Sequence, residues 1–199
     1  MREWAWRLGA SGLLIRFWAD ILALWRQHPE NPTLAALFAS ETLTILLLLA
    51  ATSPRARDLE PRAVVATFGA TFHFLALDIR ASGHLLPESA CLALMLAGLA
   101  WQAYAKLSLG RAFDLLPAHR GTVVRGAYRL VRHPIYLGYL VCHCGFLASH
   151  ACLRNAAVYA ALYLLQAERM QREERCLETD PAYAHYRARV RWRLLPGLY

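Results

Sequence analysis

The stretch Gly126-Ala-Tyr128-Arg-Leu-Val-Arg132-His133-Pro134-Ile-Tyr136-Leu-Gly138 marks the point where a polar, arginine-rich connector becomes an apolar helix. Proline is favoured in the first turn of a helix, because its missing N–H has no partner there in any case. About eighteen residues after Pro134 carry no formal charge, which is close to the length that crosses a bilayer. The stretch therefore predicts a membrane helix that begins at Pro134.

The composition indicates that the chain crosses a membrane several times. Hydrophobic residues make up 57% of the 199 residues and charged residues only 18%. The mean hydropathy is positive, at +0.27. Soluble domains usually carry about a quarter charged residues, so this chain is too apolar for that class. We expect an all-α, polytopic helical membrane protein that forms one membrane domain over residues 1–199.

About five apolar segments predict transmembrane helices, because each approaches the length of a bilayer crossing and carries few charges. They run from Leu34 to Thr52, Ala63 to Ile79, Glu88 to Tyr104, Pro134 to Leu153, and from about Ala156 to Leu165. Asn155 is a candidate cap of the fifth helix, which becomes highly charged from Glu168 without a breaker and should continue out of the membrane. A short amphipathic C-terminal helix, Tyr183 to Trp192, should follow Pro181.

The N-terminal segment, residues 3–26, mixes tryptophans with charged residues. That mixture favours a helix that lies in the membrane interface. A crossing helix remains the alternative, since Arg16 and Asp20 are four apart and can pair on one face. The same charges interrupt the early apolar run, so no cleavable signal peptide is expected. Two prolines within residues 28–32 should end the segment.

A few polar side chains fall inside the predicted spans. Glu41 is costly in a bilayer, so it should face other helices or lie near a helix end, and a structural hydrogen bond is a simpler role for it than catalysis. His73 is interpreted first as a core histidine and second as a pocket residue. Cys142 and Cys144 are two apart on a helix and point away from each other, so packing is favoured over a metal site.

The basic residues gather on one predicted side of the membrane. The chain has a net charge of +8, but no nucleic-acid module or basic stripe with interleaved aromatics is apparent, so nucleic acid is not an expected partner. Five spans put residues 53–62, 105–133 and the C-terminus on the same side, and this side holds 16 of the 22 Lys and Arg residues. The positive-inside rule places that side in the cytoplasm. We expect an integral protein of the bacterial inner membrane that contacts membrane lipids.

The start of the helix at Pro134 is suited to chemistry. Its unpaired N–H groups and positive dipole end favour anions and hydroxyls, and Arg132, His133 and Tyr136 converge on it. Taken alone, the tripeptide Arg132-His133-Pro134 has a simpler interpretation, as an anchor of the helix in the membrane interface. Further along, Arg169 and Glu173 share a helix face, which in isolation indicates only a solvated ion pair.

Three blocks in order give these residues a more specific meaning. Gly-x-Tyr-x-x-x-Arg-His-Pro-x-Tyr-x-Gly is followed some forty residues later by Arg169-x-x-x-Glu173-Glu174-x-x-Leu177 and then by Tyr183-x-x-Tyr186. This pattern resembles the isoprenylcysteine carboxyl methyltransferase family and its bacterial and archaeal relatives. The resemblance covers roughly residues 107–199 and implies an integral membrane methyltransferase that uses S-adenosylmethionine.

The resemblance also implies roles for single residues. It divides the chain into N-terminal helices, 1–104, and a cofactor-binding half, 105–199. Arg169 matches the position that faces the substrate, and Arg132 and His133 are the other catalytic candidates. The chain departs from the family pattern at Phe113, at residues 120–123 and at Asp180-Pro181. The implied cofactor contacts are Val123, Tyr128, His133, Pro134, Ile135, Tyr136, Glu173 and Glu174.

The implied reaction joins a soluble donor to a lipophilic or lipid-like acceptor. A carboxylate acceptor needs only orientation, which Arg169 could provide with help from Arg132, whereas a thiol or amine needs a base such as His133. The sequence leaves the acceptor atom and the oligomeric state open. Two other classes also remain: an NADPH-dependent sterol-reductase-like membrane oxidoreductase, and a non-catalytic membrane protein.

Overall fold

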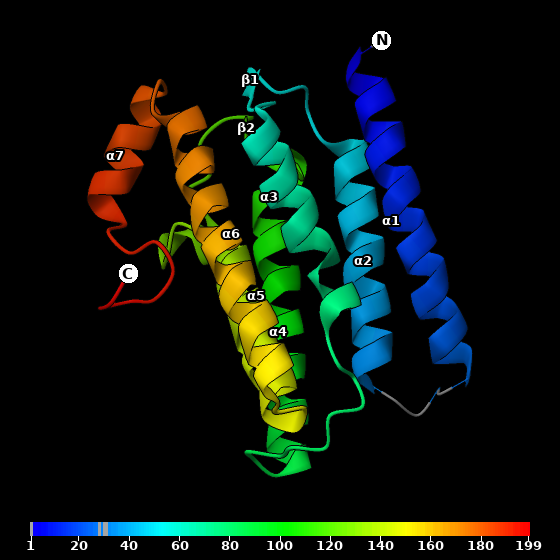
Figure 1. Ribbon diagram of the computed structural model, residues 1–199. Helices are drawn as coiled ribbons and strands as arrows, with labels where there is room; N and C mark the ends of the chain where they lie inside the picture. Colours follow the sequence, from blue (N-terminus) through cyan, green and yellow to red (C-terminus); the bar gives the residue numbers. More distant parts are fainter. Residues whose placement is uncertain (1, 28, 30–31) are drawn as a thin grey trace.

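The computed structural model describes residues 2–27, 29 and 32–199 and is almost entirely helical (Figure 1). This confirms the all-α class. The strands β1 (Ala56–Arg57) and β2 (Ala118–His119) have two residues each. The short 3-10 turns are η1 (His73–Ala76), η2 (Gly110–Ala112) and η3 (Gly126–Arg129). The α-helices are α1 (Arg2–Gln27), α2 (Pro32–Ala50), α3 (Pro61–Phe72), α4 (Glu88–Leu109), α5 (Pro134–Ser149), α6 (Leu153–Leu177) and α7 (Pro181–Arg189).

Two helices of the described chain are long and apolar enough to cross a membrane. These candidate spans are Thr33–Ala50 and Glu88–Ala112, and the apolar helix Pro134–Ser149 is shorter. The predicted fourth span thus begins at Pro134 as expected but ends four residues early, at Ser149. The total of about five spans stays a prediction.

The second predicted span, Ala63 to Ile79, is wrong in its length. Helix α3 ends at Phe72, and the chain continues as the 3-10 turn η1 and then as extended backbone at Leu77. The side chain of Asn155 holds this extended part: its amide oxygen accepts from the Asp78 N–H at 2.8 Å, and its amide nitrogen donates to the Asp78 carbonyl at 2.9 Å. Asn155, which is distant in the sequence, therefore provides the backbone of Asp78 with hydrogen bonds in place of those of a longer helix.

The predicted cap of the fifth helix, Asn155, is wrong. Helix α6 begins at Leu153, and Cys152 is its N-cap, with its sulfur accepting from the Asn155 N–H at 3.4 Å. Asn155 lies inside the first turn and is fully buried. The expected continuation of this helix past its apolar part is confirmed, because α6 runs unbroken to Leu177.

The N-terminal helix α1 packs along α2 and runs antiparallel to it, so it is not set across the end of the bundle (Figure 1). Arg16 and Asp20 pair as the crossing alternative supposed, with their charged atoms 3.3 Å apart, but α1 is not among the candidate spans, so its placement in the interface or across the membrane stays a prediction. Trp18 ties the two helices together, since its indole N–H donates to Thr42 Oγ1 at 2.8 Å. The predicted break at 28–32 falls mostly on residues 28, 30 and 31, which lie outside the described part of the chain.

Helices α4 and α5 pack closely because glycines meet at their crossing. A Cβ atom on Gly98 would lie 2.4 Å from the Cys142 nitrogen, and one on Gly138 would lie 2.9 Å from the Gly98 carbonyl oxygen. Such small residues allow the backbones of two membrane helices to approach each other. This contact sets the position of the α5 N-terminus, and therefore of His133 and Tyr136, against α4.

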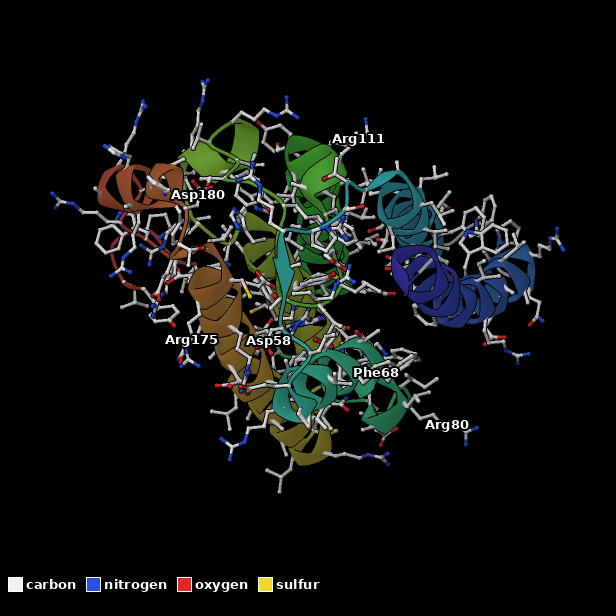
Figure 2. The ribbon with its side chains drawn as sticks, turned by 90° about the horizontal axis from the view of Figure 1, so that it is seen from above. Asp58, Phe68, Arg80, Arg111, Arg175 and Asp180 are labelled. Carbon is white, nitrogen blue, oxygen red and sulfur yellow. The ribbon has the colours of Figure 1, made fainter. Side chains whose placement is uncertain are left out.

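The connectors that were predicted to share one side do lie at the same end of the bundle, together with α7 (Figure 1). Strands β1 and β2 pair antiparallel there, with Ala56 opposite His119. The Asp114 carboxylate is held by Arg57 at 2.7 Å and by Arg120 at 2.8 Å. Seen from above, α6 and α7 lie on one side of the molecule and α1 and α2 on the other (Figure 2). The connectors that cover this end of the bundle are therefore joined to one another by strand pairing and ion pairs.

Candidate active site

His133 lies immediately before α5, where it is the N-cap residue, and it is held by two carboxylates of α6. Its Nε2–H donates to Glu174 Oε1 at 3.1 Å, and its Nδ1 lies 3.6 Å from Glu173 Oε2. Burial lowers the pKa of His133, but hydrogen bonds and charge from the two glutamates outweigh it and raise the pKa above its usual value. The two carboxylates therefore stabilise the imidazolium form of His133 relative to its stability in a free histidine side chain.

Glu174 points away from the cavity and is enclosed by cations. Arg132 Nε lies 3.0 Å from Glu174 Oε1, as an ion pair without hydrogen-bond alignment, and Arg193 NH2 donates to Oε2 at 3.0 Å. Burial raises the pKa of Glu174, but the hydrogen bonds from His133 and Arg193 lower it to about 2. The side chain is 4% exposed. Glu174 thus clamps His133, Arg132 and Arg193 together, and its predicted contact with the cofactor stays a prediction.

The C-terminal segment completes this clamp, which the sequence did not indicate. The backbone N–H groups of Arg132 and His133 donate to the carbonyls of Trp192 and Arg193 at 2.9 and 2.8 Å. Arg193 then reaches Glu174 with its guanidinium. A single arginine near the end of a chain carries no local signal for such a contact, so only the fold reveals it.

Glu173 is turned toward the cavity, where it accepts a hydrogen bond from the Tyr136 hydroxyl. Burial raises the pKa of Glu173, whereas His133, Arg169 and Tyr136 together lower it below its usual value. Because 28% of the side chain is still accessible, this carboxylate can contact a molecule inside the cavity. The predicted meeting of the α5 N-terminus with the acidic part of α6 is therefore present in the structure.

A cavity of about 1130 Å³ runs from the region of His133 and Glu173 into the helix bundle. Pro134 does not line the cavity; it is buried, and its carbonyl accepts from the Trp101 indole at 2.9 Å. Glu174 does not line it either. The predicted site residues that do line the cavity are Val123, Tyr128, Arg132, His133, Ile135, Tyr136, Arg169 and Glu173.

Two tyrosines of α7 also line the cavity, although they were not among the predicted contacts. Tyr186 donates to the Tyr128 carbonyl at 2.9 Å. The Tyr183 hydroxyl is buried near the Glu174 carboxylate, which acts on it. The spacing Tyr183-x-x-Tyr186 was the signal that could have identified them, because residues three apart share a helix face.

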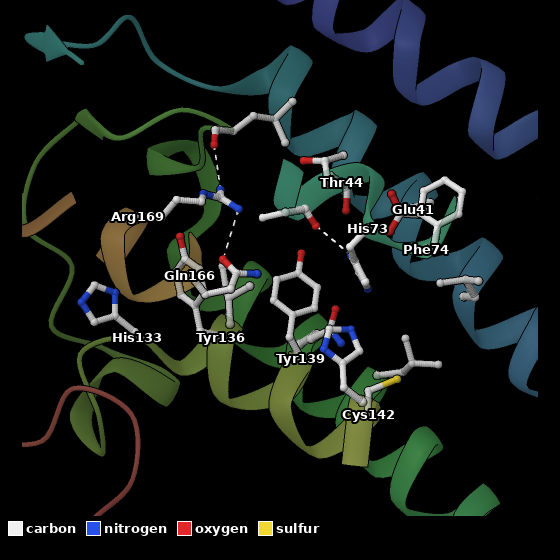
Figure 3. Close-up of a pocket in the computed structure, with 18 of the residues that line it drawn as sticks. Glu41, Thr44, His73, Phe74, His133, Tyr136, Tyr139, Cys142, Gln166 and Arg169 are labelled. Atoms are coloured by element: carbon white, nitrogen blue, oxygen red, sulfur yellow. Dashed lines mark hydrogen bonds between the residues drawn. The ribbon is translucent and has the colours of Figure 1, made fainter. Parts of the chain in front are cut away.

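We call the part of the cavity that is lined by His133, Tyr136 and Glu173 the polar end. Arg169 lies at its inner border (Figure 3). Its NH2 donates to the Leu115 carbonyl at 2.9 Å, and its Cζ lies 5.5 Å from the centre of the Tyr136 ring. Its Nε has no hydrogen-bond partner, and no carboxylate among the described residues lies within ion-pair distance. A buried guanidinium in this state favours an anion from outside the protein.

The polar end fits an adenosyl sulfonium compound. The Glu173 carboxylate can hold an ammonium or a sulfonium, and the rings of Tyr128 and Tyr183 offer surfaces for a purine or a cation. Among the described residues, no group of three His, Cys, Asp or Glu side chains could hold a metal ion.

Comparison with known proteins agrees with the geometry. No curated protein matches the chain at a significant level. Residues 91–179 match the model of the isoprenylcysteine carboxyl methyltransferase (ICMT) family, which confirms the resemblance seen in the motifs. This match, together with the apolar helices, indicates an integral membrane protein and an enzyme of the methyltransferase class. Residues 91–179, a little less than half of the chain, are therefore similar to the isoprenylcysteine carboxyl methyltransferase family.

Proposed function

We propose that the protein is an integral membrane methyltransferase that uses S-adenosylmethionine and methylates a carboxylate of a lipophilic, lipid-like acceptor. The observation that carries the proposal is the contact between the α5 N-terminus and α6. Tyr136 and His133 meet Glu173 at the wall of one cavity, beside an arginine that lacks an acidic partner. The cofactor supplies an electrophilic methyl group on a sulfonium.

In this proposal Glu173 holds the cationic part of the cofactor, and Tyr136 keeps that carboxylate aimed into the cavity. Tyr128, Val123 and Ile135 form the surrounding wall. Alignment of donor and acceptor and exclusion of water are the main contributions that an enzyme can make to an in-line methyl transfer. The buried polar end meets both needs.

A carboxylate acceptor is favoured because the site lacks a good base. His133 donates Nε2–H to Glu174, and its raised pKa keeps it protonated over a wider pH range. A thiol or amine acceptor would need to lose a proton to such a group. Arg169, a lining residue whose guanidinium has no ion-pair partner among the described carboxylates, can orient an ionised carboxylate instead. Arg132 then acts through Glu174 and His133.

We place the polar end at the cytoplasmic surface of a bacterial inner membrane. The connectors and the C-terminal segment gather at this end, and they hold most of the lysines and arginines. This charge asymmetry supports the orientation through the positive-inside rule. A soluble cofactor would enter from the cytoplasm, and the acceptor would enter from the lipid phase.

Calorimetry on the detergent-solubilised protein tests the proposal. S-adenosylhomocysteine should bind, and NADPH should not. Glu173→Ala should weaken S-adenosylhomocysteine binding by ~1–3 kcal/mol, because a buried hydrogen bond to a charged group is lost. Binding of NADPH alone would identify a reductase. Failure of both to bind would indicate a non-catalytic protein, and unchanged affinity in Glu173→Ala would remove that residue from the site.

Arg169→Ala separates acceptor use from cofactor binding. It should leave the affinity for S-adenosylhomocysteine nearly unchanged and reduce methyl transfer into a membrane extract. Arg175→Ala is the matched control, because Arg175 lies on the same helix but is exposed. If Arg169→Ala transfers methyl groups as well as the control, the guanidinium does not bind the acceptor.

A further inference from the structure

The cavity continues beyond Arg169 into the N-terminal half of the chain. Its inner wall is supplied by α1, α2, α3 and the turn η1, with Leu37, Glu41 and Phe74 among the lining residues. These elements lie outside residues 91–179, which match the methyltransferase family. The inner part of the cavity is therefore built by a region that can differ from other members of the family, and it suits a determinant of acceptor choice.

Three carboxylates line this part of the cavity: Asp20 pairs with Arg16, Glu88 is exposed, and Glu41 is half-buried. The neighbours of Glu41 on α2 are occupied: Lys106 of α4 donates from Nζ to Ser40 Oγ at 3.0 Å and to Thr44 Oγ1 at 2.8 Å. Glu41 itself makes no hydrogen bond or ion pair with the described residues, although Lys106 is near enough for its charge to act on the carboxylate. A carboxylate placed in a membrane bundle without a direct partner is costly, so a functional reason is needed.

Glu41 and Arg169 flank the same residue from two sides. The Tyr139 ring stands between them in the cavity (Figure 3). Both charges act on its hydroxyl. The guanidinium and the carboxylate do not pair with each other, and each faces the same space. Arg169 and Glu41 thus line the same cavity with the Tyr139 side chain between them, and neither has a direct partner of opposite charge among the described residues.

We infer that the inner cavity takes an amphiphile whose head carries both a carboxylate and an amino group. Arg169 holds the carboxylate, Glu41 accepts hydrogen bonds from the ammonium, and the apolar tail lies against Leu37, Phe74 and their neighbours. This inference rests on the proposed function, because it names the class of acceptor. It goes beyond that function in assigning Glu41 as the residue that selects the head group.

The test compares three amphiphiles with the same tail: 2-aminododecanoic acid, 2-hydroxydodecanoic acid and dodecanoic acid. Each is titrated calorimetrically into the purified protein in a neutral detergent, without any methyl donor. The wild type should bind the amino acid at least about tenfold more tightly than the other two, which is the scale of one charge-assisted hydrogen bond. Equal binding of all three would overturn the inference, and this comparison needs no variant.

Glu41→Gln keeps the size of the side chain and removes its charge. It should abolish the preference for the amino compound, while Glu41→Asp should retain it. Glu88→Gln is the matched control, because Glu88 also lines the cavity but is exposed on α4. If Glu41→Gln retains the preference and only unfolds more easily, the carboxylate merely balances Lys106, and the inference is wrong.

The two proposals can fail separately. Titration of S-adenosylhomocysteine into the same preparations reports on the polar end alone. Normal binding of this nucleoside without a preference among the three amphiphiles would contradict only the assignment of Glu41. The reverse result would leave the amphiphile site standing and would remove the methyltransferase function.

Discussion

Glu174 joins three segments of the chain through one buried carboxylate. It contacts His133 and Arg132 before α5 and Arg193 in the C-terminal segment. Loss of one partner from a buried ionic group costs about 3–5 kcal/mol, because the remaining charges keep their desolvation penalty. We expect Glu174→Gln to lower the free energy of unfolding by ~3 kcal/mol in a denaturant titration in detergent.

The control for this variant is Glu178→Gln. Glu178 is exposed, and its carboxylate lies 4.0 Å from the Arg187 guanidinium, so the loss should stay below ~0.5 kcal/mol. Equal losses in the two variants would show that Glu174 contributes no more than a surface charge.

The pH dependence of stability follows from the same residues. The folded-state pKa of Glu174 is lowered from 4.5 to about 2, so its contribution is present above about pH 4.5 and is lost as the pH falls toward 2. The pKa of His133 is raised above 6.5, so its contribution is complete below that value and is lost as the pH rises through the folded-state pKa.

The stability difference between the wild type and Glu174→Gln should therefore be largest between about pH 4.5 and 6.5 and should decline on both sides. Thermal unfolding in detergent across this range measures it. A difference that is independent of pH would mean that these two groups do not titrate as a pair.

At the scale of elements, the crossing of α4 and α5 depends on Gly98. An added Cβ would meet backbone atoms of α5 at 2.4 and 2.7 Å, so the helices would have to separate. We expect Gly98→Ala to destabilise the protein by ~1–3 kcal/mol, the usual range for overpacking. Gly12→Ala in α1 is the control, because no atom lies within 4 Å of its Cβ position and alanine favours the helix. Equal thermal midpoints of the two variants would contradict this packing.

The turn at the other end of the bundle depends on Asn155. Its side chain bonds both backbone groups of Asp78 and also donates to the His150 carbonyl at 2.8 Å. Asn155→Ala should cost ~2–4 kcal/mol, because several buried backbone groups would lose their partners at ~1–3 kcal/mol each. Leu153→Ala, at a side chain that is 86% exposed, is the control for thermal unfolding. A similar midpoint in both variants would show that the loop is held by other contacts.

The sequence predicted the features of helices that depend only on local residues. The start of α5 at Pro134 and the unbroken run of α6 follow from the proline and from the absence of a breaker. The length of α3 could not be predicted, because its end depends on Asn155, which is distant in the sequence. The orientation of α1 likewise depends on packing against α2.

For the whole molecule, the motif predicted which segments meet but not how each side chain is used. Glu173 and Glu174 are neighbours in one motif, yet one faces the cavity and the other faces Arg193. Consecutive residues on a helix point about 100° apart, and only the position of α5 decides which of the two is turned inward. Glu41 had no place in the motif, because only the fold shows that it lines the cavity.

The polar end is assembled from segments that are remote in sequence, so a bound cofactor should order all of them together. We expect S-adenosylhomocysteine to slow amide hydrogen exchange in residues 122–136, 169–177 and 181–193, because ligand binding to the folded state opposes local opening. The loop 79–87, at the other end of the bundle, is the internal control and should not change (Figure 1). Mass spectrometry of the peptides measures the effect. Protection confined to one of the three segments would show that they do not enclose the same molecule, and equal protection by NADPH would show that the pocket is not selective for the methyl donor.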